Sequence, residues 1–237
     1  MSVNVLIIVA HPDDEVLGMG GTILKHFKKG DSVTIAYLTT GITSRRSTDF
    51  KNSTNYSSSN KEKLEMGKQI KKLCEDARAA CKILKVKDNI FFDLPDNEMD
   101  TVSPSKIKKI IKKILKEKKP ERIYTSHYGD LNVDHRIVCD SVLATCESVK
   151  SNVNEIFCFE ILSSTEWAFP YTFRPNYFVD IKNEISEKIQ AMKCYKNEIR
   201  KFPHPRSVEG IKNASLRWGT VSGLKCAEAF ELIKKFD

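Results

Sequence analysis

The sequence lacks the features that define several large classes of protein. No apolar stretch approaches the roughly 18–20 residues that a helix needs to span a bilayer, so we expect no transmembrane segment. The short apolar run at the N-terminus has neither a basic segment before it nor a small-residue cleavage site after it. We therefore interpret residues 3–9 as a strand and not as a signal peptide. These absences predict a cytoplasmic protein.

Cysteine is not scarce, but its spacing lacks any metal-binding or disulfide framework. The seven cysteines include no CxxC pair. An odd number of cysteines without a secretion signal is typical of buried, reduced thiols. We therefore expect neither a disulfide nor a zinc site built from cysteine.

Positive charge is in excess, with 39 basic and 31 acidic residues and a net charge of +8. Such an excess suits nucleic acid, an anionic membrane surface or an anionic small substrate. In residues 105–119, however, the isoleucines follow helical spacing and the lysines fall on the opposite face, which is typical of a solvated helix. The chain carries no recognisable nucleic-acid-binding motif. We therefore do not expect nucleic acid as a partner, although the charge keeps that class as a rival.

Strand and helix patterns alternate along most of the chain. Apolar runs predict strands at 3–9, 32–39, 89–92 and 121–126. Helical periodicity predicts helices at 16–29, 61–84, 105–119 and 133–148. This order predicts an α/β fold: a Rossmann-like, doubly wound and mainly parallel sheet with helices on both faces.

The remainder of the chain is less regular. Beyond residue 150 we expect strands near 155–161 and 176–180 and helices at 182–201 and 222–235. We therefore expect a single domain over 1–237, with a Rossmann-like core in 1–150 and additional strands and C-terminal helices in 151–237. The polar stretch 40–60 has almost no apolar residues and is typical of a lid or binding loop.

Two acidic, histidine-containing stretches follow predicted strands. VAHPDDEVLG (9–18) follows the first strand, and SHYGDLNVDHR (126–136) follows the strand that ends near 126. Adjacent carboxylates repel one another, and a bound cation offsets that repulsion. In a doubly wound sheet, ligands bind beyond the carboxyl ends of the strands, where the first and fourth strands are neighbours. The two loops are therefore candidates to hold one metal ion.

Other interpretations of the first stretch stay open. Asp13 or Asp14 could instead accept amide hydrogens as the N-cap of the following helix. The glycines at 18, 20 and 21 lack the GxGxxG order of a phosphate-binding loop and lie inside the predicted helix. They favour close packing of that helix on the sheet.

Several stretches resemble one known family. AHPDDEVLGMGGTI resembles the opening motif of the PIG-L/LmbE-like zinc-dependent N-deacetylases, and DLNVDHRIV resembles their second motif. FDLPDNEMD (92–100), FEILSSTEWAF (159–169) and the tail that begins PHPRSVEG (203–210) are also similar to segments of that family. The resemblance spans nearly the whole chain in order.

The resemblance implies a set of roles at the matching positions. It implies that His11, Asp14 and His135 bind Zn²⁺ and that Asp13 is the general base. It also implies that Asp134 is a catalytic partner beside the last ligand. Ligand sets of histidine and aspartate suit other divalent first-row ions as well.

One position departs from the family pattern. Many members have histidine three residues before the last ligand, where this chain has Asn132. An amide donates a hydrogen bond to an oxyanion but does not carry a proton at neutral pH. Either Asp13 both takes and returns the proton, or His127 or His204 supplies it.

Four residues are candidates for substrate binding: Arg46, Asp96, His127 and His204. Each also has a structural interpretation. Asp96 follows a proline in a turn-prone stretch, where Asx-turn capping explains it equally well. His204 lies in a proline-flanked turn, and Arg46 could be solvated.

Together these features predict a metal-dependent hydrolase that removes an acetyl group from an amide nitrogen. The resemblance implies an N-acetylglucosamine-type sugar, sugar nucleotide or glycoconjugate as substrate. The main alternative is a non-catalytic carbohydrate- or nucleotide-binding module on the same fold, which the missing histidine would suit. A homo-oligomer is compatible with the sequence.

Overall fold

The computed structural model describes residues 2–39, 60–148 and 152–235. Its centre is one seven-stranded sheet with the strand order β3-β2-β1-β4-β5-β7-β6. Strands β1 (Asn4–Val9), β2 (Ser32–Thr39), β3 (Asp88–Leu94), β4 (Arg122–Ser126) and β5 (Glu155–Phe159) pair in parallel. Strands β7 (Ala227–Lys235) and β6 (Tyr177–Asp180) add an antiparallel edge. The predicted α/β, doubly wound and mainly parallel fold is confirmed.

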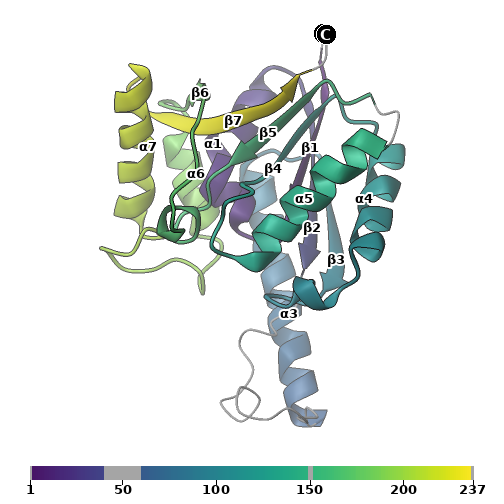
Figure 1. Ribbon diagram of the computed structural model, residues 1–237. Coiled ribbons are helices and arrows are strands. Elements are labelled where there is room, and N and C mark those ends of the chain that lie inside the picture. Colours follow the sequence, from purple (N-terminus) through teal and green to yellow (C-terminus); the bar gives the residue numbers. More distant parts are fainter. Residues whose placement is uncertain (1, 40–59, 149–151, 236–237) are drawn as a thin grey trace.

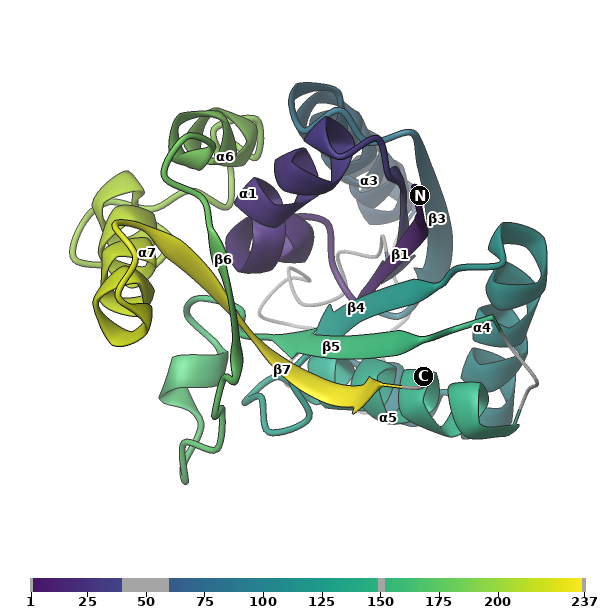
Figure 2. The same ribbon diagram turned by 90° about the horizontal axis from the view of Figure 1, so that it is seen from above.

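Helices cover both faces of this sheet (Figures 1 and 2). One face carries α1 (Asp14–Lys28), α3 (Asn60–Ile83), α6 (Ile185–Met192) and α7 (Val208–Ser222). The other face carries α4 (Pro104–Lys118) and α5 (Val133–Ser148), with the short η2 (Met99–Thr101) beside them. The short η3 (Thr165–Trp167) follows β5. Each face therefore has its own buried cluster, as a sheet covered on both sides requires.

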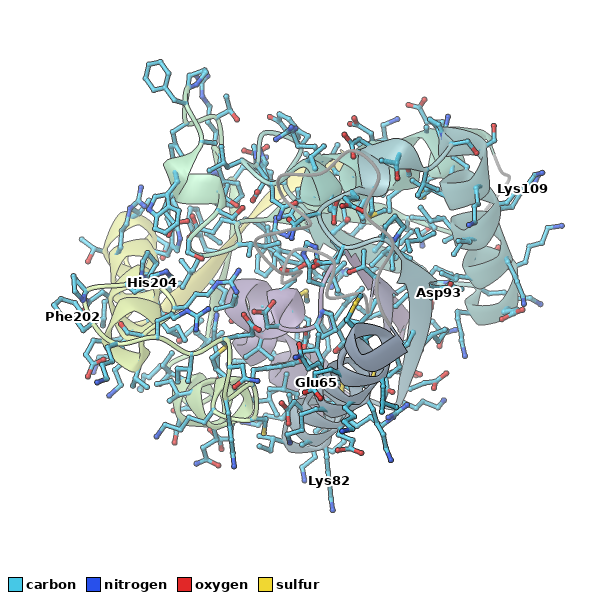
Figure 3. The ribbon with its side chains drawn as sticks, turned by 90° about the horizontal axis from the view of Figure 1, so that it is seen from below. Glu65, Lys82, Asp93, Lys109, Phe202 and His204 are labelled. Atoms are coloured by element: carbon cyan, nitrogen blue, oxygen red, sulfur yellow. The ribbon has the colours of Figure 1, made fainter. Side chains whose placement is uncertain are left out.

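Helix α4 shows why the chain carries so many lysines. Its isoleucines, such as Ile107 and Ile111, are buried against the sheet, while its lysines lie mainly on the exposed side. Lys109 points outward at the edge of the molecule (Figure 3). The expectation of a solvated helix face is therefore correct.

Helix α1 follows the short loop after β1 and is bent after its first turn. Met19 leaves the helical region with φ −146° and ψ 24°, which divides α1 into two parts. Glu228 of β7 accepts the amide hydrogens of Gly21 (2.9 Å) and Thr22 (2.6 Å), so it caps the second part. The Lys188 ammonium of α6 contacts Glu228 at 2.6 Å, and both side chains are almost fully buried.

Two glycines let α1 approach its neighbours. A Cβ at Gly18 would overlap the ring of Phe159, and one at Gly21 would lie 2.6 Å from Ile181. Close packing, and not phosphate binding, therefore explains these glycines.

The C-terminal region corrects two sequence predictions. The segment expected as a helix at 222–235 is mostly strand β7, and the helix lies earlier, at Val208–Ser222. The helix expected at 182–201 is confined to Ile185–Met192 and is followed by turns and a cis Phe202–Pro203 bond. Burial decides the first difference, because Ala227 to Glu231 is inserted between β5 and β6 and is buried on both faces.

Two further sequence predictions are not tested by the structure. Residues 40–59 lie outside the described residues, so the lid or binding loop expected in 40–60 stays a prediction. The expectation that residues 1–237 form a single domain also stays a prediction. Within the described ranges, no helix is both long and apolar enough to cross a membrane.

Candidate metal and catalytic site

The site lies where β1 and β4 end. These two strands pair in parallel, with Ile8 opposite Thr125, so their carboxyl ends lie side by side. The loop after β1 carries His11 and Asp13 and leads into α1, which begins at Asp14. The loop after β4 leads from His127 into the first turn of α5, which carries His135. The two remote stretches are therefore brought together at the point where the winding reverses.

Three of these side chains converge on one point. Nδ1 of His11 lies 3.1 Å from Nε2 of His135, and that nitrogen lies 3.4 Å from Oδ1 of Asp14. One ligand atom from each residue lies within 4.8 Å of the others. Asp14 and His135 are buried, and His11 is partly exposed. The structure thus brings together the three residues expected as metal ligands.

The outer nitrogens of both imidazoles face carboxylates. Nε2 of His11 lies 3.0 Å from Asp134 and 3.1 Å from Asp96. Nδ1 of His135 lies 3.0 Å from Asp130. A carboxylate only accepts hydrogen bonds, so each outer nitrogen carries the hydrogen and each inner nitrogen of a neutral ring presents a lone pair.

With both rings neutral, the inner atoms are acceptors that face one another without a donor between them. Oδ1 of Asp14 is also buried and has no hydrogen-bond partner among the described residues. Three convergent lone pairs with an orphaned carboxylate oxygen fit a divalent cation, and carboxylates behind histidine ligands are usual at such sites. The donor set therefore fits the metal that the sequence predicts.

The pKa values of these groups also indicate that the cluster of carboxylates stabilises positive charge at this point. Burial lowers the pKa of His11, but its hydrogen bonds to Asp134, Asp14 and Asp96 outweigh burial and raise it well above its usual value. Burial likewise opposes the change at His135, yet Asp14 and Asp130 raise its pKa to about 9. The two imidazoles in turn hold the pKa of Asp14 well below its usual range, although burial opposes this.

Asp134 supports His11 and not the adjacent His135. Besides its contact with His11, its carboxylate accepts the amide hydrogens of Asn97 (2.6 Å) and Met99 (3.1 Å). A second group of potential ligands, His11, Asp96 and Asp134, shares the His11 ring with the first. Because Asp134 is already held by two amides, it is better suited to orienting that ring.

Asp13 lies beside the cluster in an unusual conformation. Its φ is 116°, and its side chain makes no capping hydrogen bond to α1, so the N-cap interpretation does not describe it. Its Oδ2 accepts a hydrogen bond of 2.8 Å from Arg206. Burial, opposed by Arg206 and reinforced by the charge of Asp14, raises the pKa of Asp13 to about 8.

Asn132 has a structural task in the described residues. Its Oδ1 accepts the amide hydrogen of Asp134 at the start of α5, and its Nδ2 donates to Oδ1 of Asn97 at 2.8 Å. It therefore joins the loop after β4 to the loop after β3. One hydrogen of the Nδ2 amide is left for a further acceptor.

The substrate-binding candidates are placed in different ways. Asp96 contacts His11, as described above. His127 is fully buried against Phe173 and accepts the amide hydrogen of Gly129, so it has no exposed surface for a substrate. Arg46 lies outside the described residues.

His204 is partly exposed. Its Nδ1 accepts the amide hydrogen of Arg206 at 3.1 Å, and its ring meets the edge of Trp167. In Figure 3 His204 lies inward of Phe202, on the side of α1. Burial, with the charges of Arg206 and Arg200, lowers the pKa of His204, so the ring is neutral at pH 7 with its hydrogen on Nε2.

The sequence analysis missed the residues that hold the site from the second half of the chain. Arg206 contacts Asp13, while Ser164 and Thr165 hydrogen-bond to Asp130. Arg206 is part of the PHPRS stretch, in which only His204 stood out as chemically suggestive. An arginine two residues after a candidate histidine, in a chain that needs a counter-charge for Asp13, was the available signal.

Comparisons with known proteins identify the family of the chain. A family model described as PIG-L, GlcNAc-PI de-N-acetylase, matches residues 6–146, more than half of the chain. A diacetylchitobiose deacetylase of Thermococcus kodakarensis is 27% identical over 242 residues, covering 97% of this chain and 83% of that protein. A probable N-acetyl-alpha-D-glucosaminyl L-malate deacetylase of Bacillus subtilis is 25% identical over 202 residues, covering 84% of each chain.

A solved structure adds a limit to what the fold alone implies. The 4-carboxy-2-hydroxymuconate hydratase of Pseudomonas putida KT2440 matches with a TM-score of 0.74 at 19% identity, over 100% of this chain and 98% of that one. At this identity the likeness concerns only the fold. An activity must therefore be argued from the site and the sequence relatives.

Proposed function

The chain belongs to the PIG-L family, and from that premise we propose that it is a zinc-dependent hydrolase that removes the N-acetyl group from an N-acetylglucosamine-type sugar or conjugate. The observation that carries this proposal is the convergence of His11, Asp14 and His135 on one point. The deacetylases among its sequence relatives support the choice of an acetamide as the bond that breaks.

The three converging residues would hold the ion. When bound, zinc supplies two effects: it lowers the pKa of a water from about 15.7 toward about 7, and it polarises a carbonyl oxygen. Asp134 and Asp130 keep the two imidazoles in the tautomers that this requires. The chain's own residues must supply the proton transfers.

Asp13 is the proposed general base. It takes a proton from the water that attacks the acetamide carbonyl carbon. The carbon–nitrogen bond then breaks, the nitrogen receives a proton, and acetate and a free amine leave. Asn132 is the proposed donor to the oxyanion through its remaining amide hydrogen.

The same Asp13 is the proposed source of the returning proton. His127 is fully buried, and a neutral His204 is a weak acid, so neither matches the task as well. Once Asp13 has taken the proton of the attacking water, its own carboxyl is an acid that can give this proton back to the nitrogen. His204 is instead proposed to donate a hydrogen bond from Nε2 to the sugar.

The test is acetate release by the metal-loaded protein from a panel of N-acetylglucosamine, diacetylchitobiose and a sugar nucleotide. We expect release from at least one of them and a loss of about 10²–10⁴-fold in kcat for Asp13→Asn with bound metal retained. Binding of a sugar without acetate release by the wild type would favour the non-catalytic binding module. Higher activity on the sugar nucleotide than on the uncharged sugars would indicate that the excess positive charge favours an anionic substrate, and equal activity would contradict that.

A further inference from the structure

The backbone of Asp13 needs support from elsewhere in the molecule. Its φ of 116° lies in a region that residues with a side chain rarely adopt, and such conformations persist only where the surroundings enforce them. The side chain of Asp13 does not supply this support, because it makes no capping hydrogen bond. Two groups from the second half of the chain reach Asp13 from opposite ends.

The first support acts on the backbone. The amide of Asp13 donates to Oε2 of Glu15 at 3.1 Å. The hydroxyl of Tyr195 donates to Oε1 of the same carboxylate at 2.6 Å. Glu15 and Tyr195 are both buried, with exposures of 0% and 1%, so water does not compete for these bonds. Tyr195 thus fixes the carboxylate that holds the Asp13 amide.

The second support acts on the side chain. Arg206 donates from one terminal nitrogen to Oδ2 of Asp13 at 2.8 Å. Its Nε donates to the hydroxyl of Ser163 at 2.7 Å, and Glu198 lies 3.5 Å from the same terminal nitrogen. A planar guanidinium held at two places has little freedom to rotate, so it fixes the direction of the carboxylate.

We propose that Tyr195 and Arg206 are positioning residues for Asp13: Tyr195 holds its backbone through Glu15, and Arg206 holds its carboxylate directly. The kinetic part of this inference rests on the proposed role of Asp13 as general base. A reacting group that is displaced by 1 Å can lose about 100-fold in rate. Both residues therefore govern turnover through Asp13.

The kinetic test uses matched pairs of variants. Tyr195→Phe removes the hydroxyl bound to Glu15, and Tyr124→Phe removes an equally buried hydroxyl that lies 3.0 Å from His26. We expect Tyr195→Phe to lower kcat about 10- to 100-fold with KM and metal content unchanged, and Tyr124→Phe to leave kcat unchanged. Arg206→Lys is paired in the same way with Arg122→Lys, whose guanidinium binds Glu155.

A double-mutant cycle tests the path through Glu15. If Tyr195 acts through Glu15, Tyr195→Phe should add little to the loss already caused by Glu15→Gln. Additive losses in kcat would overturn this path. A Tyr195→Phe variant with the kcat of the wild type would overturn the role of Tyr195 itself.

Crystal structures of the variants give a readout that does not depend on activity. We expect Asp13 to leave its positive φ in Tyr195→Phe and its carboxylate to turn away in Arg206→Lys. An unchanged Asp13 in both variants would overturn the inference. If the wild type releases no acetate from any substrate, the proposed function fails, and these structures still decide whether the two residues position Asp13.

Discussion

The two halves of the described chain contribute different things to the site. The residues proposed to meet the metal or the attacking water all lie just after β1 or β4, in the following loops or the first turns of α1 and α5: His11, Asp13, Asp14 and His135. The second half supplies Ser164, Thr165, Tyr195 and Arg206, which meet carboxylates of the first half. The first half therefore provides the reactive groups, and the second half fixes where they point.

This difference shows that the proposed ligands alone do not make the site, because residues from the second half must also hold the carboxylates in place. The loop from His11 to Glu15 concentrates buried negative charge and a strained residue, which the first half alone does not balance. The contacts with Tyr195 and Arg206 offset part of that cost. We therefore expect changes in the first half to abolish the chemistry and changes in the second half to weaken it.

The largest effect should come from His135→Ala. It leaves only His11 and Asp14, whereas a catalytic zinc normally takes three protein ligands. We expect loss of bound metal in elemental analysis and loss of acetate release. His204→Ala is the matched control and should keep its metal, because His204 belongs to the second half. Full metal content in His135→Ala would contradict the assignment of His135 as a ligand and, with it, the division of roles between the two halves.

A large loss of stability should come from Glu228→Gln in the second half. Glu228 and Lys188 are 2% and 3% exposed, so the change leaves a buried ammonium without its counter-charge and weakens the cap of α1. Removing one partner of a buried pair typically costs about 3–5 kcal/mol. Denaturant unfolding measures this cost, and Lys188→Met/Glu228→Gln should recover part of it. A loss below about 1 kcal/mol, the scale of a surface pair, would contradict this role.

A smaller effect is expected for Asp130→Asn, which lies between the two halves. Asp130 accepts from His135 and is held by Ser164 and Thr165. An amide in its place supports the His135 tautomer less well, and changes behind a metal ligand typically lower metal affinity about 10- to 100-fold. Metal titration measures the change. Ser164→Ala should lower the affinity by a smaller factor. An unchanged affinity in both variants would contradict the inference that the second half of the chain influences metal binding through Asp130.

The smallest effect concerns the pH dependence of stability and the pair formed by His26 and Asp31. Nδ1 of His26 lies 2.7 Å from Oδ2 of Asp31, and neither residue belongs to the site. Burial, opposed by Asp31, lowers the pKa of His26. A histidine with a lowered folded pKa contributes stability that is present above its unfolded pKa of about 6.5 and is lost as the pH falls through the folded value.

Comparison with a variant isolates this pair. Between about pH 7.5 and pH 5.5, the difference in Tm between wild type and His26→Gln should shrink by up to about 4 °C, the shift that 1 kcal/mol gives in a chain of this size. His11 and His135 contribute to the pH dependence of Tm in the opposite direction, but they do so in both proteins, so the difference in Tm cancels their contributions. A gap that widens as the pH falls would contradict the sign.

Sequence patterns predicted the first half well because its signals are local. The continuous apolar runs of β1 and β4 mark strands buried on both faces, and the winding rule places their ends together. The approach of His11 to His135 could therefore be expected from the sequence. The tautomers could not, because they depend on where Asp96, Asp130 and Asp134 point.

The second half was less predictable because tertiary contacts decide it. The composition AEAFELIKK favours a helix, yet these residues form β7 because the sheet offers a position between β5 and β6. The true helix carried its own signals: Ser207 caps its first turn, and Gly223 ends it at φ 74°. The support of Asp13 by Tyr195 and Arg206 has no local signal, since its contacts join residues 180 and 193 positions apart.

The cap of α1 has a consequence for the order in which a new chain matures. The helix that carries Asp14 starts at the fourteenth residue, but the carboxylate that caps its second part arrives with residue 228. A chain emerging from the ribosome can therefore pair its early strands before α1, which carries the proposed ligand Asp14, is fully capped. We expect firm binding of the proposed ion to require that β7 has been inserted into the sheet.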